Sequence, residues 1–300
     1  MAREVTFISE DVECSALLFV PGDLLLGERR PAVVMAPGFA RVKDDPVLMA
    51  LAGRFSEAGL IAMVIDYRNF GKSGGEPRQF ADPAGQVEDY RNAITWVSQL
   101  PEVDPVRIGV WGGSFSGGHV LKVGAYDRRV KAVVSQAPMV NGWESTRANS
   151  RSDQFRNLQE MLIQERIRRY NERTIKYVKI IAAEGEPSLT QDAESRAFSA
   201  RMAETCPTWR NEMALHSLER FLEYDPGASI HLISPTPLMM IIPLQDHLSQ
   251  TDFMLAAYQR ALEPKALTTI EGGHFAVHVE PGFSQAARAA SEWFQRHLMR

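Results

Sequence analysis

Residues 106–122 read VRIGVWGGSFSGGHVLK and decide the fold expected of this chain. The run begins as a short apolar stretch typical of a buried strand, passes through two glycines and Ser114, and continues with residues that favour a helix. A serine held at such a sharp turn needs small neighbours, because bulky side chains would clash with the adjoining strand and helix. Gly112 is one such neighbour, and Ser116 stands where a second glycine is usual. The pattern predicts that Ser114 is a nucleophile.

Two other interpretations of this turn stay open at the level of the sequence. With Ser116 as the nucleophile, Ser114 and Gly118 would flank it, but Ser116 would lie half a turn inside the helix. Alternatively, Ser114 only caps the helix. We favour Ser114 as the nucleophile, because further residues suited to the same chemistry follow along the chain.

Buried-strand patterns alternate with helical patterns around this turn, which predicts an α/β fold with a parallel sheet covered by helices on both faces. The first 20 residues alternate apolar and polar side chains and predict a hairpin. The strand patterns lie at 31–36, 60–66, 106–111, 130–136, 237–243 and 265–272, and the helical patterns at 45–59, 82–100, 115–126, 251–262 and 281–298.

The alternation stops over residues 141–229, where no strand pattern occurs. A structureless loop of this length would be unusual in a compact domain. We therefore expect a helical cap inserted after strand 6, which is the strand at 130–136 when the two strands of the hairpin are counted. The core is then formed by residues 1–140 and 230–300. The cap helices are expected at roughly 150–183, 189–204 and 207–224, and the arginines of the first are interpreted as a solvated face rather than as a site for an acidic ligand.

The composition is that of an ordinary globular protein. Of the 300 residues, 45% are hydrophobic, and 33 basic against 37 acidic residues give a net charge of −4. The share of hydrophobic residues excludes a disordered chain. The small net charge indicates neither a nucleic-acid partner nor binding to a membrane. Cys14 and Cys206 are expected to be free thiols, and neither a signal peptide nor an apolar run of membrane-spanning length is evident. We expect a cytoplasmic protein, and a homodimer is compatible with these features.

A serine hydroxyl is a weak nucleophile, so it needs a general base and an acid that orients the base. His274 follows the last strand pattern, and Asp246 follows the strand pattern before it, which gives the order serine, acid, histidine expected of this architecture. Asp252 is the alternative acid, although it falls inside a predicted helix, and Asp246 could also be a simple helix cap. The other histidines fit packing, capping or surface positions better, among them His119, His216 and His278.

Two backbone N–H groups should stabilise the negative charge that develops on the substrate oxygen. Phe115 follows the nucleophile and supplies one. The loop after the first parallel strand should supply the other, where Gly38 permits an unusual turn that aims the N–H of Phe39 at the site.

Apolar side chains of the insert are candidates for the substrate pocket. Met139 and Trp143 lie where the chain enters the insert and should be close to the nucleophile. Trp209 and Met213 would share one face of the third cap helix and form a roof, unless they are simply the core of the cap. A pocket lined by these side chains favours a hydrophobic or aromatic acyl ester over a peptide or a sugar ester.

Five segments together resemble the α/β-hydrolase superfamily. They are most similar to its X-prolyl dipeptidyl-peptidase-like and dienelactone-hydrolase-like branch, which includes esterases, thioesterases and polyketide-tailoring hydrolases. The segments are PGFARVKDD, IDYRNFGKSGGEPR, EVDPVRIGVWGGSFSGGHVLKVGAYDRRVKAVVSQAP, ISPTPLMMI and EGGHF.

This resemblance implies the α/β-hydrolase fold, a triad of Ser114, Asp246 and His274, and an oxyanion hole formed by Phe39 and Phe115. Pro37 stands where many relatives have histidine, and Ser116, in place of glycine, is expected to crowd the turn slightly. No dinucleotide, phosphate-loop or metal-ligand motif is present, so neither a cofactor nor a metal is expected. The predicted function is hydrolysis of a small-molecule ester or thioester. The alternatives are acyl transfer on the same triad and ligand binding without catalysis.

Overall fold

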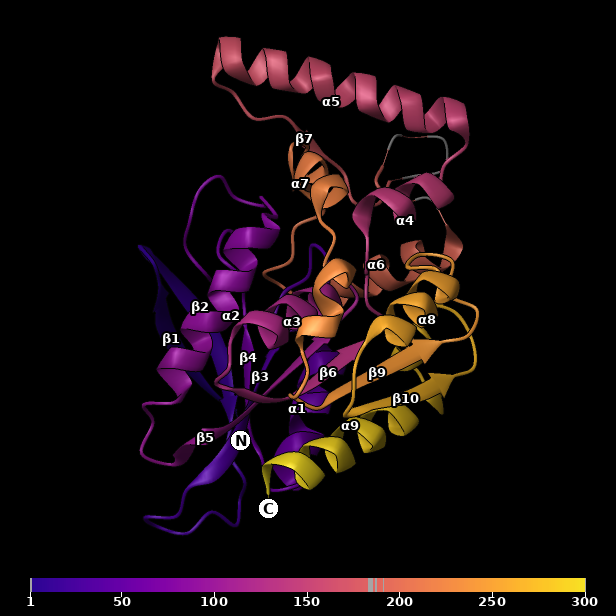
Figure 1. The fold of residues 1–300 in the computed structure, drawn as a ribbon. Coiled ribbons are helices and arrows are strands. Elements are labelled where there is room, and N and C mark those ends of the chain that lie inside the picture. Colours follow the sequence, from indigo (N-terminus) through magenta and orange to yellow (C-terminus); the bar gives the residue numbers. More distant parts are fainter. Residues whose placement is uncertain (1, 183–185, 187, 191, 300) are drawn as a thin grey trace.

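The computed structural model describes residues 2–182, 186, 188–190 and 192–299, and within them an eight-stranded sheet forms the centre of the molecule (Figure 1). The strands lie in the order β1-β2-β4-β3-β5-β6-β9-β10. β1 pairs with β2, and β2 with β4, in antiparallel fashion, and all other neighbours are parallel. The predicted α/β-hydrolase sheet is confirmed. Its strands are Ala2–Ser9 (β1), Val12–Phe19 (β2), Arg30–Ala36 (β3), Ile61–Ile65 (β4), Val103–Gly113 (β5), Val130–Gln136 (β6), Leu238–Pro243 (β9) and Lys265–Ile270 (β10).

Helices cover both faces of this sheet, which is why its central strands are apolar throughout. Every side chain of β4 and β9 is buried. α1 and α9 pack on one face, and α2, α3 and α8 pack on the other. The helices are Pro46–Glu57 (α1), Pro83–Val97 (α2), Phe115–Tyr126 (α3), Thr251–Arg260 (α8) and Gly282–Leu298 (α9), with 3-10 turns at Gly227–Leu232 and Ala276–His278.

Two of these helices begin with the same local signal. The carboxylate of Asp45 accepts the backbone N–H of Val47 at 2.9 Å, and Pro46 occupies the first position of α1. Asp82 and Pro83 play the same parts in α2. An aspartate cap satisfies an amide that has no partner within the helix, and proline fits the first turn because its missing N–H is not needed there.

The insert between β6 and β9 is not entirely helical, so that part of the prediction is wrong. Two short strands, Tyr177–Val178 (β7) and Met213–Ala214 (β8), pair antiparallel. Strands of two residues are too short to give a periodic pattern. The helices of the insert are Gly142–Ala148 (α4), Ser152–Glu172 (α5), Ala193–Thr205 (α6) and Ser217–Glu223 (α7), and α5 lies farthest from the sheet (Figure 1).

The first and third cap helices are shorter than the sequence predicts. The helix expected over 150–183 ends at Glu172, and the one expected over 207–224 begins only at Ser217. Between them, the side chain of Asn211 binds both the N–H and the carbonyl of Ile181, at 2.9 Å each. The amide of Asn211 thus supplies the hydrogen bonds that the backbone of Ile181 would otherwise make within a helix. Positions 183 and 191 of the helix predictions lie outside the described residues.

Within the described ranges, no helix combines the length and the apolar character that a membrane span requires. Cys14 and Cys206 are both free and buried, as predicted.

Candidate active site

Ser114 lies at the turn between β5 and α3 in a backbone conformation that few residues with a side chain adopt. Its φ is +58°, and its N–H donates to the carbonyl of Gln136 at 2.8 Å. The turn is tight, because a Cβ on Gly112 would lie 2.2 Å from the carbonyl oxygen of Ser116. The small residues predicted from the sequence are therefore required here. The side chain of Ser114 is half-buried and faces a cavity.

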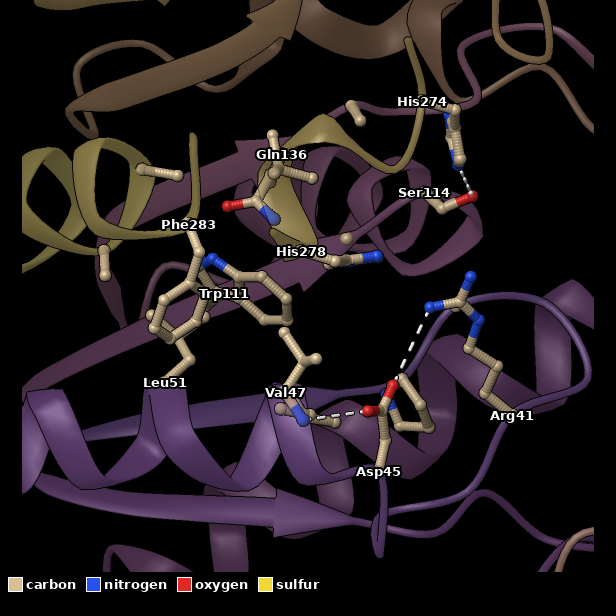
Figure 2. Close-up of a pocket in the computed structure, with 18 residues that line it drawn as sticks. Arg41, Asp45, Val47, Leu51, Trp111, Ser114, Gln136, His274, His278 and Phe283 are labelled. Atoms are coloured by element: carbon tan, nitrogen blue, oxygen red, sulfur yellow. Dashed lines mark hydrogen bonds and ion pairs between the residues drawn. The ribbon is translucent and has the colours of Figure 1, made fainter. Parts of the chain in front are cut away.

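A continuous chain of hydrogen bonds links Ser114 to two residues from distant loops. The Ser114 hydroxyl lies 2.9 Å from Nε2 of His274 (Figure 2), and Nδ1 of His274 lies 2.6 Å from a carboxylate oxygen of Asp246. Asp246 follows β9 and His274 follows β10, and these strands run parallel to β5, which ends just before Ser114. The parallel sheet thus brings the three residues selected from the sequence together at one edge.

Backbone amides hold the carboxylate of Asp246 in place. Its other oxygen accepts the N–H groups of Leu248 and Ser249, at 2.8 and 3.0 Å. Burial alone would raise the pKa of Asp246, but the facing His274 and the two amides outweigh burial and lower the pKa below its usual value. Asp246 is therefore held as a carboxylate. The alternative acid, Asp252, lies in the first turn of α8 with an exposed side chain and is not part of the hydrogen-bond chain.

The two phenylalanines proposed for the oxyanion hole lie beside the nucleophile. Phe39 and Phe115 line the same cavity as Ser114, and their rings meet edge to face, with centroids 5.2 Å apart. Phe115 is the first residue of α3, so its N–H lies at the end of the helix where amides have no partner within the helix. Gly38 allows the loop to approach, because a Cβ there would lie 3.2 Å from the Cβ of Ser114.

The hydroxyl of Ser116 makes two close contacts at the start of α3, and the slight crowding expected from the sequence stays a prediction. The side chain of Ser116 is fully buried, and its hydroxyl lies 2.5 Å from the carbonyl of Pro37 and also bonds to the hydroxyl of Tyr67. Pro37 precedes Gly38 and Phe39, so this serine ties the start of α3 to the loop that should supply an oxyanion donor. The two departures from the family pattern are therefore in direct contact with each other.

A cavity of about 900 Å³ opens between the sheet edge and the insert. Met139 and Trp209 line it, as predicted, and the indole N–H of Trp209 donates to the carbonyl of Ala40 at 2.9 Å. The other two pocket predictions do not hold. Trp143 is 43% exposed and packs against Phe155 outside the cavity.

Met213 is the second misplaced pocket residue. It belongs to β8 rather than to a helix, and its side chain is completely buried in the core. It shares no helix face with Trp209, because no helix spans the two positions.

Sequence reasoning missed several cavity residues that come from segments without a motif. Phe198 on α6 and Phe221 on α7 line the cavity, and so does Arg41, which lies two residues beyond Phe39. Of these three residues, only Arg41 could have been expected in the cavity from the sequence, because it lies in the PGFARVK loop. Among the described residues, no group of His, Cys, Asp and Glu is placed to hold a metal ion.

The sequence matches a family model described as alpha/beta hydrolase fold over residues 31–281. This chain belongs to the α/β-hydrolase family. Over 280 residues it is 32% identical to thiohydrolase aneE of Aspergillus aculeatus, and this alignment covers 89% of this chain and 84% of that relative. Over 279 residues it is 30% identical to polyketide transferase claH of Penicillium crustosum, which covers 91% and 90% of the two chains.

A solved structure is similar over the whole length of this α/β hydrolase. The crystal structure of the α/β hydrolase GrgF from Penicillium superposes with a TM-score of 0.84 at 26% identity and covers 100% of both chains. Together with the curated relatives, this match shows an enzyme of hydrolytic type. The narrower branch suggested by the sequence stays a prediction.

Proposed function

We propose that this α/β hydrolase cleaves a carboxylic ester or thioester of a small hydrophobic or polyketide-like molecule through an acyl-enzyme on Ser114. One observation carries the proposal: the hydrogen-bond chain from Asp246 through His274 to Ser114 ends inside a cavity large enough for a small-molecule substrate. Such an arrangement activates a serine for attack on an acyl carbonyl. A protein that only binds ligands would not need it.

In the first half of the reaction, the Ser114 oxygen attacks the carbonyl carbon while Nε2 of His274 accepts the hydroxyl proton. Asp246 keeps the Nδ1 proton of His274 in place and stabilises the imidazolium that forms. The N–H groups of Phe39 and Phe115 would donate to the oxyanion. The carbon–sulfur or carbon–oxygen bond of the leaving group then breaks, and His274 returns the proton to the departing thiol or alcohol.

In the second half, His274 removes a proton from water, and the resulting attack releases the acid and restores Ser114. An acceptor hydroxyl or thiol in place of water would give acyl transfer instead. One relative at 30% identity is named a polyketide transferase, which favours transfer as the second candidate function. A cavity of about 900 Å³ has room for an acyl chain and a small acceptor together.

Aromatic side chains on both sides of the cavity support a hydrophobic acyl group. Phe39 and Phe115 come from the core, and Phe221 from α7 packs against both rings, with centroids 5.3 and 5.4 Å away. Apolar surface of this kind stabilises a bound alkyl or aromatic chain by removing it from water.

The test compares p-nitrophenyl and thioester substrates in wild type, Ser114→Ala and Ser199→Ala. Ser199 is the matched control, because it lines the same cavity from α6 but stands outside the hydrogen-bond chain. Ser114→Ala should lose turnover by about three orders of magnitude or more, with an unchanged circular dichroism spectrum. Ser199→Ala should stay within about threefold of wild type. Full activity of Ser114→Ala would contradict the proposal, and product analysis with an added alcohol separates hydrolysis from transfer.

A further inference from the structure

Arg41 lies where the large cavity meets a second, smaller one. The smaller cavity, of about 30 Å³, is drawn in Figure 2 and is bordered by Arg41, Ser114 and His274, and all three also line the large cavity. A volume of this size holds about two water-sized groups. The guanidinium of Arg41 points toward the space below Ser114 (Figure 2). A substrate whose carbonyl sits at Ser114 therefore comes close to a positive charge.

The hydrogen-bonding capacity of this guanidinium is almost unused. The side chain is 13% exposed, and Nη1 lies 3.7 Å from Asp45, which is beyond hydrogen-bond distance. Within the described part of the chain it forms no hydrogen bond with another group. The Asp45 carboxylate is also engaged in capping α1 through Val47. A guanidinium carries five N–H donors, so those that face the two cavities are available to a ligand.

Two aromatic rings fix the orientation of Arg41. Its guanidinium carbon lies 3.6 Å from the ring centre of Phe198 and 5.4 Å from that of Phe275. Phe198 comes from the cap, and Phe275 follows His274 in the core. Stacking uses the flat face of the guanidinium and leaves the N–H groups along its edge free to bind a planar ligand.

Arg41 and Asp45 are the charged side chains that line the small cavity, and the Asp45 carboxylate is already held by the N–H of Val47. Burial and the nearby Arg41 lower the pKa of His278 well below its usual value, so its ring is neutral. Burial lowers the pKa of Arg41 to about 10, which keeps it protonated near neutral pH. His278 lines the small cavity, and its buried Nδ1 has no hydrogen-bond partner among the described residues. It offers a second polar contact beside Arg41.

We propose that Arg41 forms an anion subsite, with His278 beside it, that binds a carboxylate carried by the substrate close to the bond that Ser114 attacks. This inference rests on the proposed function and narrows it to acidic esters or thioesters. Two oxygens fit the small cavity, and a guanidinium edge binds a carboxylate through two parallel hydrogen bonds. Since the large cavity is mostly aromatic and aliphatic, the remainder of the substrate stays apolar.

The carboxylate could belong to the acyl group or to the leaving group, and the substrates separate these sources. Three thioesters are compared: hexanoyl-N-acetylcysteamine, which is neutral; adipoyl-N-acetylcysteamine, with the carboxylate on the acyl group; and the hexanoyl thioester of 3-mercaptopropionate, with it on the thiol. The released thiol is measured with a colorimetric reagent. The readout is the kcat/KM of each charged substrate divided by that of the neutral one, and the charged substrate with the higher ratio identifies the source.

The variants are Arg41→Met, Arg41→Lys and the control Arg201→Met, whose exposed arginine lies on α6 outside both cavities. For one charged substrate, Arg41→Met should lower the ratio by about 10- to 100-fold. Arg41→Lys should lower this ratio less than Arg41→Met does, and Arg201→Met should leave the ratio unchanged. Ratios within twofold of wild type in both Arg41 variants would overturn the subsite, and melting curves confirm that each variant folds.

A failure of the proposed function is distinguishable from a failure of the subsite. If wild type cleaves none of the thioesters, the proposed function fails, and adipate binding by titration calorimetry then tests the subsite alone. Binding to wild type that weakens at least tenfold in Arg41→Met supports the subsite. Absence of adipate binding to wild type, or equal binding to both proteins, overturns it.

Discussion

Replacement of Asp246 by asparagine tests how the histidine is held, and the structure predicts the outcome in detail. One oxygen of Asp246 accepts two backbone N–H groups, from Leu248 and Ser249. In Asp246→Asn these donors require the amide oxygen at the same place, so the NH₂ group must occupy the position that faces His274. There it donates to Nδ1 and forces the imidazole proton onto Nε2, which can then no longer accept the proton of Ser114.

The expected loss in kcat is about 10⁴-fold, the size that a wrong histidine tautomer causes in serine proteases, which corresponds to roughly 5 kcal/mol of activation free energy. The fold should persist, because the two backbone hydrogen bonds survive. The assay is p-nitrophenyl ester turnover at a fixed pH, with a melting curve for each variant. Asp252→Asn is the matched control and should stay within about twofold, since that side chain is exposed on α8. The reasoning is refuted if Asp246→Asn keeps more than about a tenth of wild-type kcat.

Three further predictions concern neighbouring residues. Ser116→Ala removes the hydroxyl that holds the carbonyl of Pro37, so kcat/KM should fall about tenfold and the unfolding free energy by about 1–3 kcal/mol. This loss of activity is far smaller than the loss expected for Ser114→Ala. Unchanged melting and kinetics would contradict this prediction. Burial lowers the pKa of His119 to about 3, below the 6.5 of an unfolded histidine, so the unfolded state binds more protons between these values and stability falls with falling pH. The unfolding free energy should drop by about 2 kcal/mol more between pH 6.5 and 4.5 in wild type than in His119→Gln, measured with urea, and equal drops would refute this. Trp209→Ala should shift the preferred ester toward longer acyl chains whereas Trp143→Ala should not, and a panel of ester lengths checks both.

Much of the fold was predictable because its signals are local. Buried parallel strands are continuous apolar runs, and the Gly112–Ser114 turn tolerates only small residues, so both are visible in the sequence itself. The acid and base could be selected because the order of strands fixes which loops reach the edge where Ser114 lies.

The pocket was harder to predict because its walls depend on contacts between distant segments. Met213 and Trp209 were expected on one helix, but this segment is held in extended form by the pairing of Asn211 with Ile181, 30 residues away. Trp143 lies outside the cavity because α4 begins just before it and turns the indole toward Phe155. No local pattern records either contact.

The most direct test of the central claim is to locate the covalent adduct formed with a fluorophosphonate probe. Wild-type protein should gain the mass of one phosphonyl group, and tandem mass spectrometry of the digest should place it on Ser114. Ser114→Ala should gain no mass, while Ser199→Ala should label like wild type. An adduct on Ser116, or undiminished labelling of Ser114→Ala, would contradict the account.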